Sequence, residues 1–337
     1  MKDFRGKLAV ITGVGTGIGR ELACQLASEG CHLATCDISV ESLMKTKQAC
    51  QELAPAGTRI SAHPCDVSEE AQVVAFRDAM LREHGADHID LLFSNAGIGG
   101  GGSFLLDDRA DWDKTFGVCW FGVYYCARAF LPLLVASREG YIVHISSVNG
   151  FWATLGPGVP HTAYSTAKFA VKGFTEALLN DLRSFAPHVK AAVVMPGHIG
   201  TSIAFNSRMV LGKPSAKDMP ADELADLRSR LERQGIPTQA ITDQQLKGLI
   251  EQRMRDFRDK APTTAAEAAA IILDGVRRDQ WRILVGEDAE VLDRRVREHP
   301  ERAYEPDFLS GLQAEGYFAE VAAPPPRTGS PGKGAGS

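Results

Sequence analysis

The stretch that decides the fold is residues 7–19, KLAVITGVGTGIG. Its first half is a short apolar run, which is typical of a strand that is buried on both faces. Over residues 17–28 the apolar side chains of Ile18, Leu22 and Leu26 recur at helical spacing. A buried strand that turns through glycines into a helix is the start of a βαβ unit, so the stretch predicts an α/β protein.

The same alternation continues along the chain, because further apolar runs predict strands and the segments between them have helical spacing. The predicted strands are 32–38, 59–67, 90–96, 141–147, 190–195 and 282–286, and the further predicted helices are 39–53, 71–82, 108–136, 163–185 and 264–277. Pro132 is expected to end or kink the helix at 108–136. We therefore expect a doubly wound parallel sheet with helices on both faces, which binds its ligand at the carboxyl ends of the strands.

Three segments lie outside this alternation. Residues 202–262 are charged and contain two helical segments, the second opened by a capping box of Thr242 and Gln245. We interpret them as a helical insertion that covers the ligand edge as a substrate lid. Residues 291–323 are expected to form a C-terminal helical extension. The tail at 324–337 is rich in Pro, Gly and Ser and cannot bury much apolar surface, so we predict that it is disordered.

The composition excludes several classes of protein. The 337 residues carry 37 Lys and Arg against 42 Asp and Glu, and the net charge of −5 argues against nucleic acid as a partner. We find neither a signal-peptide pattern nor an apolar run long enough to span a bilayer, so we expect no membrane span and a cytoplasmic protein.

Cysteine and histidine usage predicts neither disulfides nor a metal site. All seven cysteines lie in the first 126 residues and form no CxxC pair, which indicates buried free thiols. His84 and His88 have a spacing that suits a metal on a helix, but Gly85 lies between them and no further ligands complete a site.

The glycine turn at 12–19, TGVGTGIG, follows a predicted strand and opens a predicted helix. Glycines in such a turn let the backbone approach a pyrophosphate, whose charge the helix N-terminus favours. Asp37 ends the second predicted strand, 20 residues after Gly17, where a carboxylate can accept hydrogen bonds from ribose hydroxyls and would repel a 2′-phosphate. Neither Ile38 nor Ser39 nor the glycine turn supplies a cation, so the sequence favours NAD over NADP.

The spacing GxxxGxG, the run Asn95-Ala96-Gly97 and the pair Tyr164 and Lys168 resemble the short-chain dehydrogenase/reductase family over about residues 5–290. The resemblance implies one Rossmann-type domain, 1–290, with seven parallel strands in the order 3-2-1-4-5-6-7. Together with the glycine turn and Asp37, it implies that the cofactor is bound by Gly13, Thr16, Gly17, Ile18, Gly19, Asp37, Asp66, Val67, Asn95, Ala96, Gly97, Tyr164, Lys168, Pro196, Gly197, Ile199 and Thr201. The resemblance also implies that, within this set, Thr201 and Ile199 hold the carboxamide of the nicotinamide.

The candidate catalytic residues are Ser147, Tyr164 and Lys168. Tyr164 and Lys168 are four residues apart, so they share one face of a helix. Oxidation of a secondary alcohol requires a base, and a neighbouring ammonium lowers the high pKa of a tyrosine. Ser147 would orient the substrate oxygen beside Tyr164. The resemblance implies the second serine of the pair Ser146-Ser147 as the catalytic one.

Two features depart from the family pattern. Cys119 stands where the family has an asparagine that supports a proton relay. The gap of 17 residues between Ser147 and Tyr164 is longer than usual and holds an apolar, Gly- and Pro-rich loop at 151–160. This loop is expected either to line a substrate pocket or to pack against a neighbouring subunit.

These observations predict an NAD-dependent oxidoreductase that interconverts a secondary alcohol and a ketone, with a bulky hydrophobic substrate and Tyr164 as general acid and base. One alternative is a non-catalytic NAD(H)-binding regulatory protein, which Cys119 motivates. Another is an epimerase or dehydratase of the same family, although the TGxxGxxG spacing of those relatives does not match residues 12–19. The resemblance also implies a homodimer or homotetramer through the helices at 108–136 and 163–185.

Overall fold

A computed structural model describes residues 1–155, 159–233 and 236–318 of the chain. Its centre is a seven-stranded, fully parallel sheet in the order β3-β2-β1-β4-β5-β6-β9, which confirms the predicted order. The strands are β1 (Leu8–Thr12), β2 (His32–Asp37), β3 (Ile60–Pro64), β4 (Leu91–Ser94), β5 (Gly140–Ile145), β6 (Val189–Pro196) and β9 (Arg282–Val285). The strands β7 (Ile199–Gly200) and β8 (Thr263–Thr264) form a separate two-stranded sheet.

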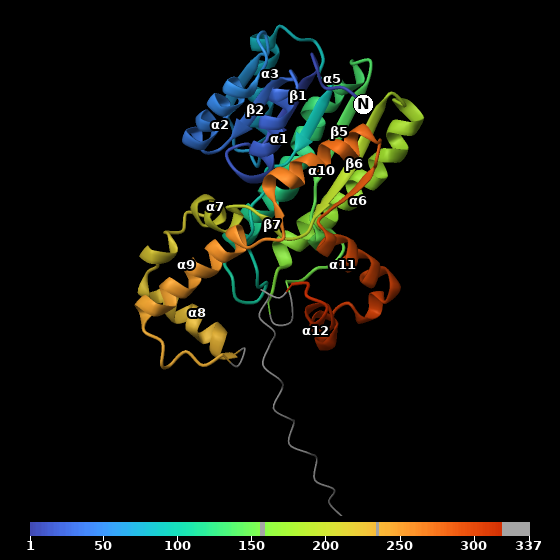
Figure 1. The fold of residues 1–337 in the computed structure, drawn as a ribbon. Coiled ribbons are helices and arrows are strands. Elements are labelled where there is room, and N and C mark those ends of the chain that lie inside the picture. The colour runs from blue at the N-terminus through green and yellow to red at the C-terminus, as the bar shows by residue number, and fades with distance from the viewer. Residues whose placement is uncertain (156–158, 234–235, 319–337) are drawn as a thin grey trace, which may run out of the picture.

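The sheet is buried because helices cover both of its faces (Figure 1). Strand β1 shows the consequence: Ala9 and Ile11 belong to one apolar core, whereas Leu8 and Val10 belong to the other. Alternate side chains of a strand point to opposite faces, so a strand covered on both sides is apolar throughout. The helices of the first face are α1 (Gly17–Ser28), α2 (Val40–Leu53) and α10 (Ala265–Arg277); those of the second are α3 (Glu70–His84), α5 (Gly122–Val135) and α6 (Thr162–Phe185).

The helix predicted at 108–136 is interrupted, but not at Pro132. It consists of α4 (Arg109–Phe116), a π-helical turn at Gly117–Phe121 and α5, and Pro132 lies inside the last turn of α5. The helix tolerates the loss of the Pro132 backbone donor and continues to Val135. The prediction that Pro132 ends this helix is therefore wrong, the predicted kink stays a prediction, and the change of helix type lies at the π-turn.

One stretch of the described residues, Arg109–Val135, is long and apolar enough to cross a membrane by length and composition alone. This differs from the expectation that no apolar run in the sequence is long enough to span a bilayer. Half of its most apolar window is buried inside the molecule, and core helices of soluble proteins have the same length and composition, so this is weak evidence for a span.

The segment at 202–262 forms three helices where two were predicted: α7 (Ile203–Val210), α8 (Ala221–Arg233) and α9 (Asp243–Asp259). The predicted capping box is present, with Thr242 and Gln245 exchanging side-chain and backbone hydrogen bonds at the start of α9. A small core of Met219, Leu224 and Leu246 holds the segment together. Figure 1 shows the three helices grouped beyond one end of the large sheet.

The chain ends in α11 (Glu287–Glu298) and α12 (Pro306–Ala314), which lie beyond the same end of the sheet. Trp152, from the apolar loop, is 3% exposed and packs among their side chains, and its Nε1 donates to the Ala303 carbonyl at 2.7 Å. The aromatic part of the loop thus packs against the C-terminal region of the same chain, whereas Leu155 and Val159 of the loop line the large cavity at the carboxyl edge of the sheet. Residues 156–158 and the predicted disordered tail at 324–337 lie outside the described residues.

All seven cysteines are buried and free, which confirms the prediction. His84 is buried at the end of α3, and its Nε2 lies 2.9 Å from the Ser61 hydroxyl. Burial is the main cause that lowers the pKa of His84 to about 4. Among the described residues no cluster of three or more His, Cys, Asp or Glu could hold a metal.

Candidate active site

A cavity of about 1150 Å³ opens at the carboxyl edge of the sheet, between the sheet and α7 and α9. All but one of the predicted site residues line it. The lining residues of the predicted set are Gly13, Thr16, Gly17, Ile18, Asp37, Asp66, Val67, Asn95, Ala96, Gly97, Ser147, Tyr164, Lys168, Pro196, Gly197, Ile199 and Thr201. The exception is Gly19.

Gly19 supports the glycine turn from behind. A Cβ at this position would overlap the Gly13 carbonyl oxygen and the Asn95 amide, so glycine is needed for α1 to approach the turn. Gly13 itself has φ +68°, and a Cβ there would lie 2.6 Å from the Ala96 Cα. Gly19 thus packs behind the turn, and its predicted contact with a cofactor stays a prediction.

The turn is also fixed by side chains from β1 and β4. Asn95 donates from Nδ2 to the carbonyls of Thr12 at 3.0 Å and Gly13 at 2.9 Å. The Thr12 hydroxyl in return accepts from the backbone N–H groups of Asn95 and Ala96. These four hydrogen bonds join the ends of two neighbouring strands and leave the turn rigid before any ligand binds.

Asp37 lies at the end of β2, with its carboxylate on the cavity. Its Oδ2 accepts from the Gly15 N–H at 2.8 Å, and its Oδ1 accepts from the Ser39 N–H at 2.8 Å. Its neighbours on the cavity wall, Ile38, Ser39 and Ser42, carry no positive charge. The carboxylate is thus aligned by two backbone amides and keeps lone pairs for the hydroxyls of a ribose.

The carboxylate of Asp66 is already paired, which the sequence did not reveal. Its Oδ2 lies 2.6 Å from the Lys114 ammonium of α4, and its Oδ1 accepts from the Ser68 hydroxyl at 2.6 Å. Burial would raise the pKa of Asp66, but these hydrogen bonds outweigh it and hold the pKa below its usual value. Asp66 therefore orders the segment after β3, and little of its carboxylate is left for a ligand.

Ser147, Tyr164 and Lys168 converge where β5 ends and α6 begins. The Lys168 ammonium lies 5.3 Å from the centre of the Tyr164 ring and donates to the Ile145 carbonyl at 2.9 Å. The Ser147 hydroxyl is near enough to the Tyr164 phenol to lower its pKa, and it accepts from the Asn149 N–H at 3.1 Å. The neighbouring hydroxyl of Ser146 donates instead to the Lys168 carbonyl at 2.8 Å, so it supports α6 rather than facing Tyr164.

Burial has opposite effects on the two titratable groups of this site. It raises the pKa of Tyr164, against the smaller influence of the Ser147 hydroxyl. It also lowers the pKa of Lys168, because an ammonium loses hydration there. Both groups are pushed toward neutrality, so a positive charge that enters the cavity would act strongly on the phenol.

Cys119 occupies the π-turn and is fully buried. Its thiol donates to the Ile98 carbonyl at 3.2 Å and accepts from the Ile98 N–H at 3.4 Å. Burial raises its pKa, so the group stays a neutral thiol. An asparagine amide also offers a hydrogen-bond donor and a hydrogen-bond acceptor. The thiol can therefore replace it in holding the backbone of the segment after β4.

We expect Cys119→Asn to keep turnover within about threefold of the wild type or to raise it, because the amide can make both bonds to Ile98. Cys119→Val is the matched control: it has a similar volume but neither function, and it leaves the Ile98 amide unpaired. We expect it to lower turnover and the melting temperature. Steady-state assays of both variants check the prediction, and a large loss in Cys119→Asn would show that the thiol has a role of its own.

Helix α7, part of the insertion predicted over the ligand edge, closes one side of the cavity through contacts that the sequence did not predict. The Asn206 amide donates to the Thr16 hydroxyl in the glycine turn at 2.8 Å. The Ser207 hydroxyl accepts from the Gly99 N–H at 2.7 Å. The helix has eight residues and no side-chain cap, so its sequence carries little signal beyond the two polar residues themselves.

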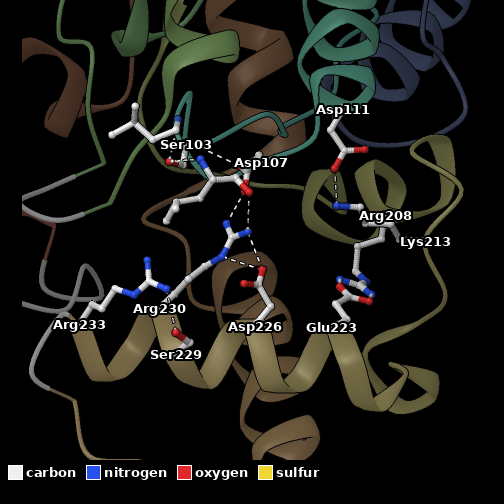
Figure 2. A network of polar contacts seen from close by, with 12 residues as sticks. Ser103, Asp107, Asp111, Arg208, Lys213, Glu223, Asp226, Ser229, Arg230 and Arg233 are labelled. Carbon is white, nitrogen blue, oxygen red and sulfur yellow. Dashed lines mark hydrogen bonds and ion pairs between the residues drawn. The ribbon is translucent and has the colours of Figure 1, made fainter.

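Helix α8 is tied to the segment that follows β4 by charged side chains (Figure 2). Arg230 pairs with Asp107 and, at 2.6 Å, with Asp226. The Asp107 carboxylate also accepts from the Ser103 N–H at 2.8 Å, so the pair reaches the backbone after β4. Burial and hydrogen bonds compete at Asp107, and the bond from Arg230 contributes to a lowered pKa.

Two further ion pairs join this part of the molecule. Lys213, which follows α7, pairs with Asp111 of α4. Arg208 of α7 pairs with Glu223 of α8 at 2.9 Å. Lys213 and Arg230 thus join the helical insertion to α4 and to the segment after β4, whereas Arg208 joins α7 to α8 within the insertion (Figure 2).

We expect Arg230→Met to loosen the insertion, because a partly buried, multiply bonded pair contributes about 1–2 kcal/mol. Limited proteolysis of residues 221–259 should become about 5–30-fold faster at equal protein concentration. Arg233→Met is the control, since Arg233 bonds only to the Ser229 hydroxyl of its own helix among the residues that the structure describes. Equal cleavage rates in both variants would show that the pairs do not hold the insertion.

The parallel sheet, the glycine turn and the cavity at the carboxyl edge define the class of Rossmann-type dinucleotide-binding proteins. Residues 7–209 match the family model described as short chain dehydrogenase. The chain belongs to the short-chain dehydrogenase/reductase family of oxidoreductases.

Individual relatives extend beyond the family model. The chain is 33% identical over 295 residues to "Putative oxidoreductase SadH" of Mycobacterium tuberculosis, covering 87% of this chain and 91% of the relative. A Burkholderia phymatum short-chain dehydrogenase/reductase solved with NAD has a TM-score of 0.70 at 29% identity, covering 91% and 98%. A metagenomic short-chain oxidoreductase solved with NADP has a TM-score of 0.51 at 31% identity, covering 58% and 83%.

Proposed function

We propose that the protein is an NAD-dependent oxidoreductase that interconverts a secondary alcohol and a ketone, with Tyr164 as general acid and base. The observation that carries this proposal is the joint position of Tyr164, Lys168 and Ser147 on a cavity that the glycine turn and Asp37 also line. A phenol, an ammonium and an orienting hydroxyl in one place are what proton transfer to or from an alcohol requires.

The residues around the cavity fit a nicotinamide dinucleotide. The glycine turn leaves room for a pyrophosphate at the start of α1, and Asp37 supports the ribose of its adenosine half. The segment from Pro196 to Thr201 would hold the carboxamide at the other end. Bound NAD⁺ would supply the hydride acceptor and one positive charge. The relatives include complexes with NAD and with NADP, so the preference for NAD is supported by Asp37 alone.

In alcohol oxidation Ser147 holds the substrate oxygen by a hydrogen bond, and Tyr164 takes the hydroxyl proton as the carbon gives up its hydride. The ammonium of Lys168 stabilises the phenolate, whose formation burial otherwise opposes. In the reverse direction Tyr164 returns the proton to the oxygen. Ser147, Tyr164 and Lys168 therefore act in both alcohol oxidation and ketone reduction, as microscopic reversibility requires.

Several apolar side chains support a bulky hydrophobic substrate. The cavity wall includes Leu155, Met209, Leu249 and Phe257, which are 37–57% exposed on the ligand-free surface. Covering them with an apolar ligand would contribute about 25 cal/mol per Å² buried. The non-catalytic alternative is suggested by Cys119 in place of an asparagine. Because the Cys119 thiol makes hydrogen bonds to Ile98, this replacement no longer argues against catalysis. The homodimer or homotetramer stays a prediction.

The test is turnover on a panel of hydrophobic secondary alcohols, with NAD⁺ and NADP⁺ in separate series and absorbance of the reduced cofactor as the signal. We expect turnover with NAD⁺ on bulky cyclic members and little with NADP⁺. Silence across the panel, combined with tight NADH binding, would favour the regulatory alternative. Bound NAD that resists dialysis without net redox change would favour the epimerase or dehydratase.

A further inference from the structure

Asp288, in the first turn of α11, reaches the segment at 196–201 from the C-terminal part of the chain. The residue is 4% exposed, and its Oδ2 accepts from the backbone N–H of His198 at 2.6 Å. Its Oδ1 is buried and has no hydrogen-bond partner among the described residues. A buried carboxylate that leaves one oxygen unpaired is costly, so a compensating role is expected.

The backbone around this carboxylate is shaped to hold it. A Cβ on Gly197 would overlap both carboxylate oxygens, and a Cβ on Gly286 would overlap Oδ1. Gly286 has φ +100°, a conformation that glycine adopts without strain. Two glycines from separate segments thus enclose one side chain, and one of them, Gly197, belongs to the segment at 196–201 that lines the cavity.

The His198 ring packs on Phe257 of α9, with its Nε2 2.7 Å from the Phe257 carbonyl, while backbone contacts fix the segment on both sides of His198. The Gly197 N–H donates to the Val285 carbonyl at 2.9 Å, and β7 pairs with β8 at Ile199 and Gly200. Between these anchors, the Asp288 carboxylate is the acceptor of the His198 N–H. It therefore sets the orientation of the peptide units that lead from Pro196 to Ile199 and Thr201.

We propose that Asp288 is a positioning residue for the nicotinamide end of the cofactor: it holds His198 so that Ile199 and Thr201 remain aligned with the carboxamide. This inference rests on the proposed function, because it needs a dinucleotide in the cavity. The carboxylate does not line the cavity, so it acts through the segment and not by contact. The family model matches residues 7–209 and therefore does not include α11. The proposed role of Asp288 makes the cofactor site depend on this helix outside the matched region.

The test compares two ligands by titration calorimetry: NAD⁺, and ADP-ribose, which has the same adenosine and pyrophosphate but no nicotinamide. We expect Asp288→Ala to weaken NAD⁺ binding about tenfold and ADP-ribose binding less than twofold. Asp288→Asn keeps an oxygen that can accept from His198, so we expect a selective loss of about threefold. It also serves if the alanine variant fails to fold.

Asp293→Asn is the matched control. Asp293 is also a buried carboxylate of α11, but it pairs with Arg282 of β9 and with Arg297, away from the segment at 196–201. We expect this variant to melt at a lower temperature with an unchanged ratio of NAD⁺ to ADP-ribose affinity. Gly197→Ala should reproduce the Asp288→Ala loss and add little to it in the double variant, because both remove the same contact.

Three outcomes overturn the inference: an equal loss of both ligands in Asp288→Ala, no loss of either ligand, or the same selective loss in Asp293→Asn. A wild-type protein that binds neither ligand would instead contradict the proposed function. The two failures are therefore distinguishable in one set of titrations.

Discussion

Tyr164→Phe is expected to lower turnover by about 10²–10⁴-fold, the usual contribution of a positioned acid or base. The variant removes only the phenol oxygen, on which the nearby Ser147 hydroxyl acts, and it keeps the ring beside Lys168. Binding of NADH should stay within about twofold, because the dinucleotide contacts of the glycine turn are untouched. Turnover on the best alcohol of the panel and fluorescence titration with NADH check the two halves of the prediction.

Tyr141→Phe is the control for this experiment. Tyr141 lies on β5 and is 1% exposed, and its hydroxyl donates to the Gln280 carbonyl at 3.2 Å. Its loss should lower stability by about 1 kcal/mol and leave turnover unchanged. Persistent turnover in Tyr164→Phe would contradict the mechanism, and loss of NADH binding would show that the variant fails for a structural reason.

The strand order and most helices could be predicted because their signals are local. Strand β1 and helix α1 follow from apolar periodicity, and α9 and α10 begin at capping boxes that four adjacent residues define. The expected helix end at Pro132 failed because packing of an apolar helix in the core can outweigh the cost of one proline, and α5 continues to Val135. The π-turn at Cys119 has no signal in the spacing of the residues.

The residues of the candidate site that follow the carboxyl ends of strands could be predicted from the sequence. Parallel strands bring their carboxyl ends to one edge, so the positions of Asp37, Ser147 and Thr201 in the sequence are enough to place them on the same cavity. The supporting contacts were not predictable. Asp288 is 90 residues from His198 and Arg230 is 123 residues from Asp107, and nothing in either local sequence selects the partner. Trp152 likewise contacts Ala303 across 151 residues.

The second large effect is expected at Asp37, whose carboxylate carries the predicted preference for NAD. Asp37→Asn removes the negative charge but keeps an oxygen for the Gly15 or Ser39 N–H, so the glycine turn should remain ordered. At about 4 Å and an effective dielectric constant of about 20, a carboxylate and a phosphate repel each other by several kcal/mol, part of which salt and water remove. We therefore expect the ratio of kcat/KM for NADP⁺ to that for NAD⁺ to rise by about 10–100-fold.

Asp66→Asn separates this effect from a general loss of negative charge near the adenosine. Asp66 also lies on the cavity, but its carboxylate is paired with Lys114 and carries little free charge. Its replacement should weaken both cofactors alike and leave their ratio within about twofold, because the Lys114 pair orders the segment after β3 rather than selecting a ribose. Steady-state assays of both variants with each cofactor measure the ratio. An unchanged ratio in Asp37→Asn would mean that the preference arises from shape at Ile38 and Ser42, and the carboxylate would then be a support for the turn.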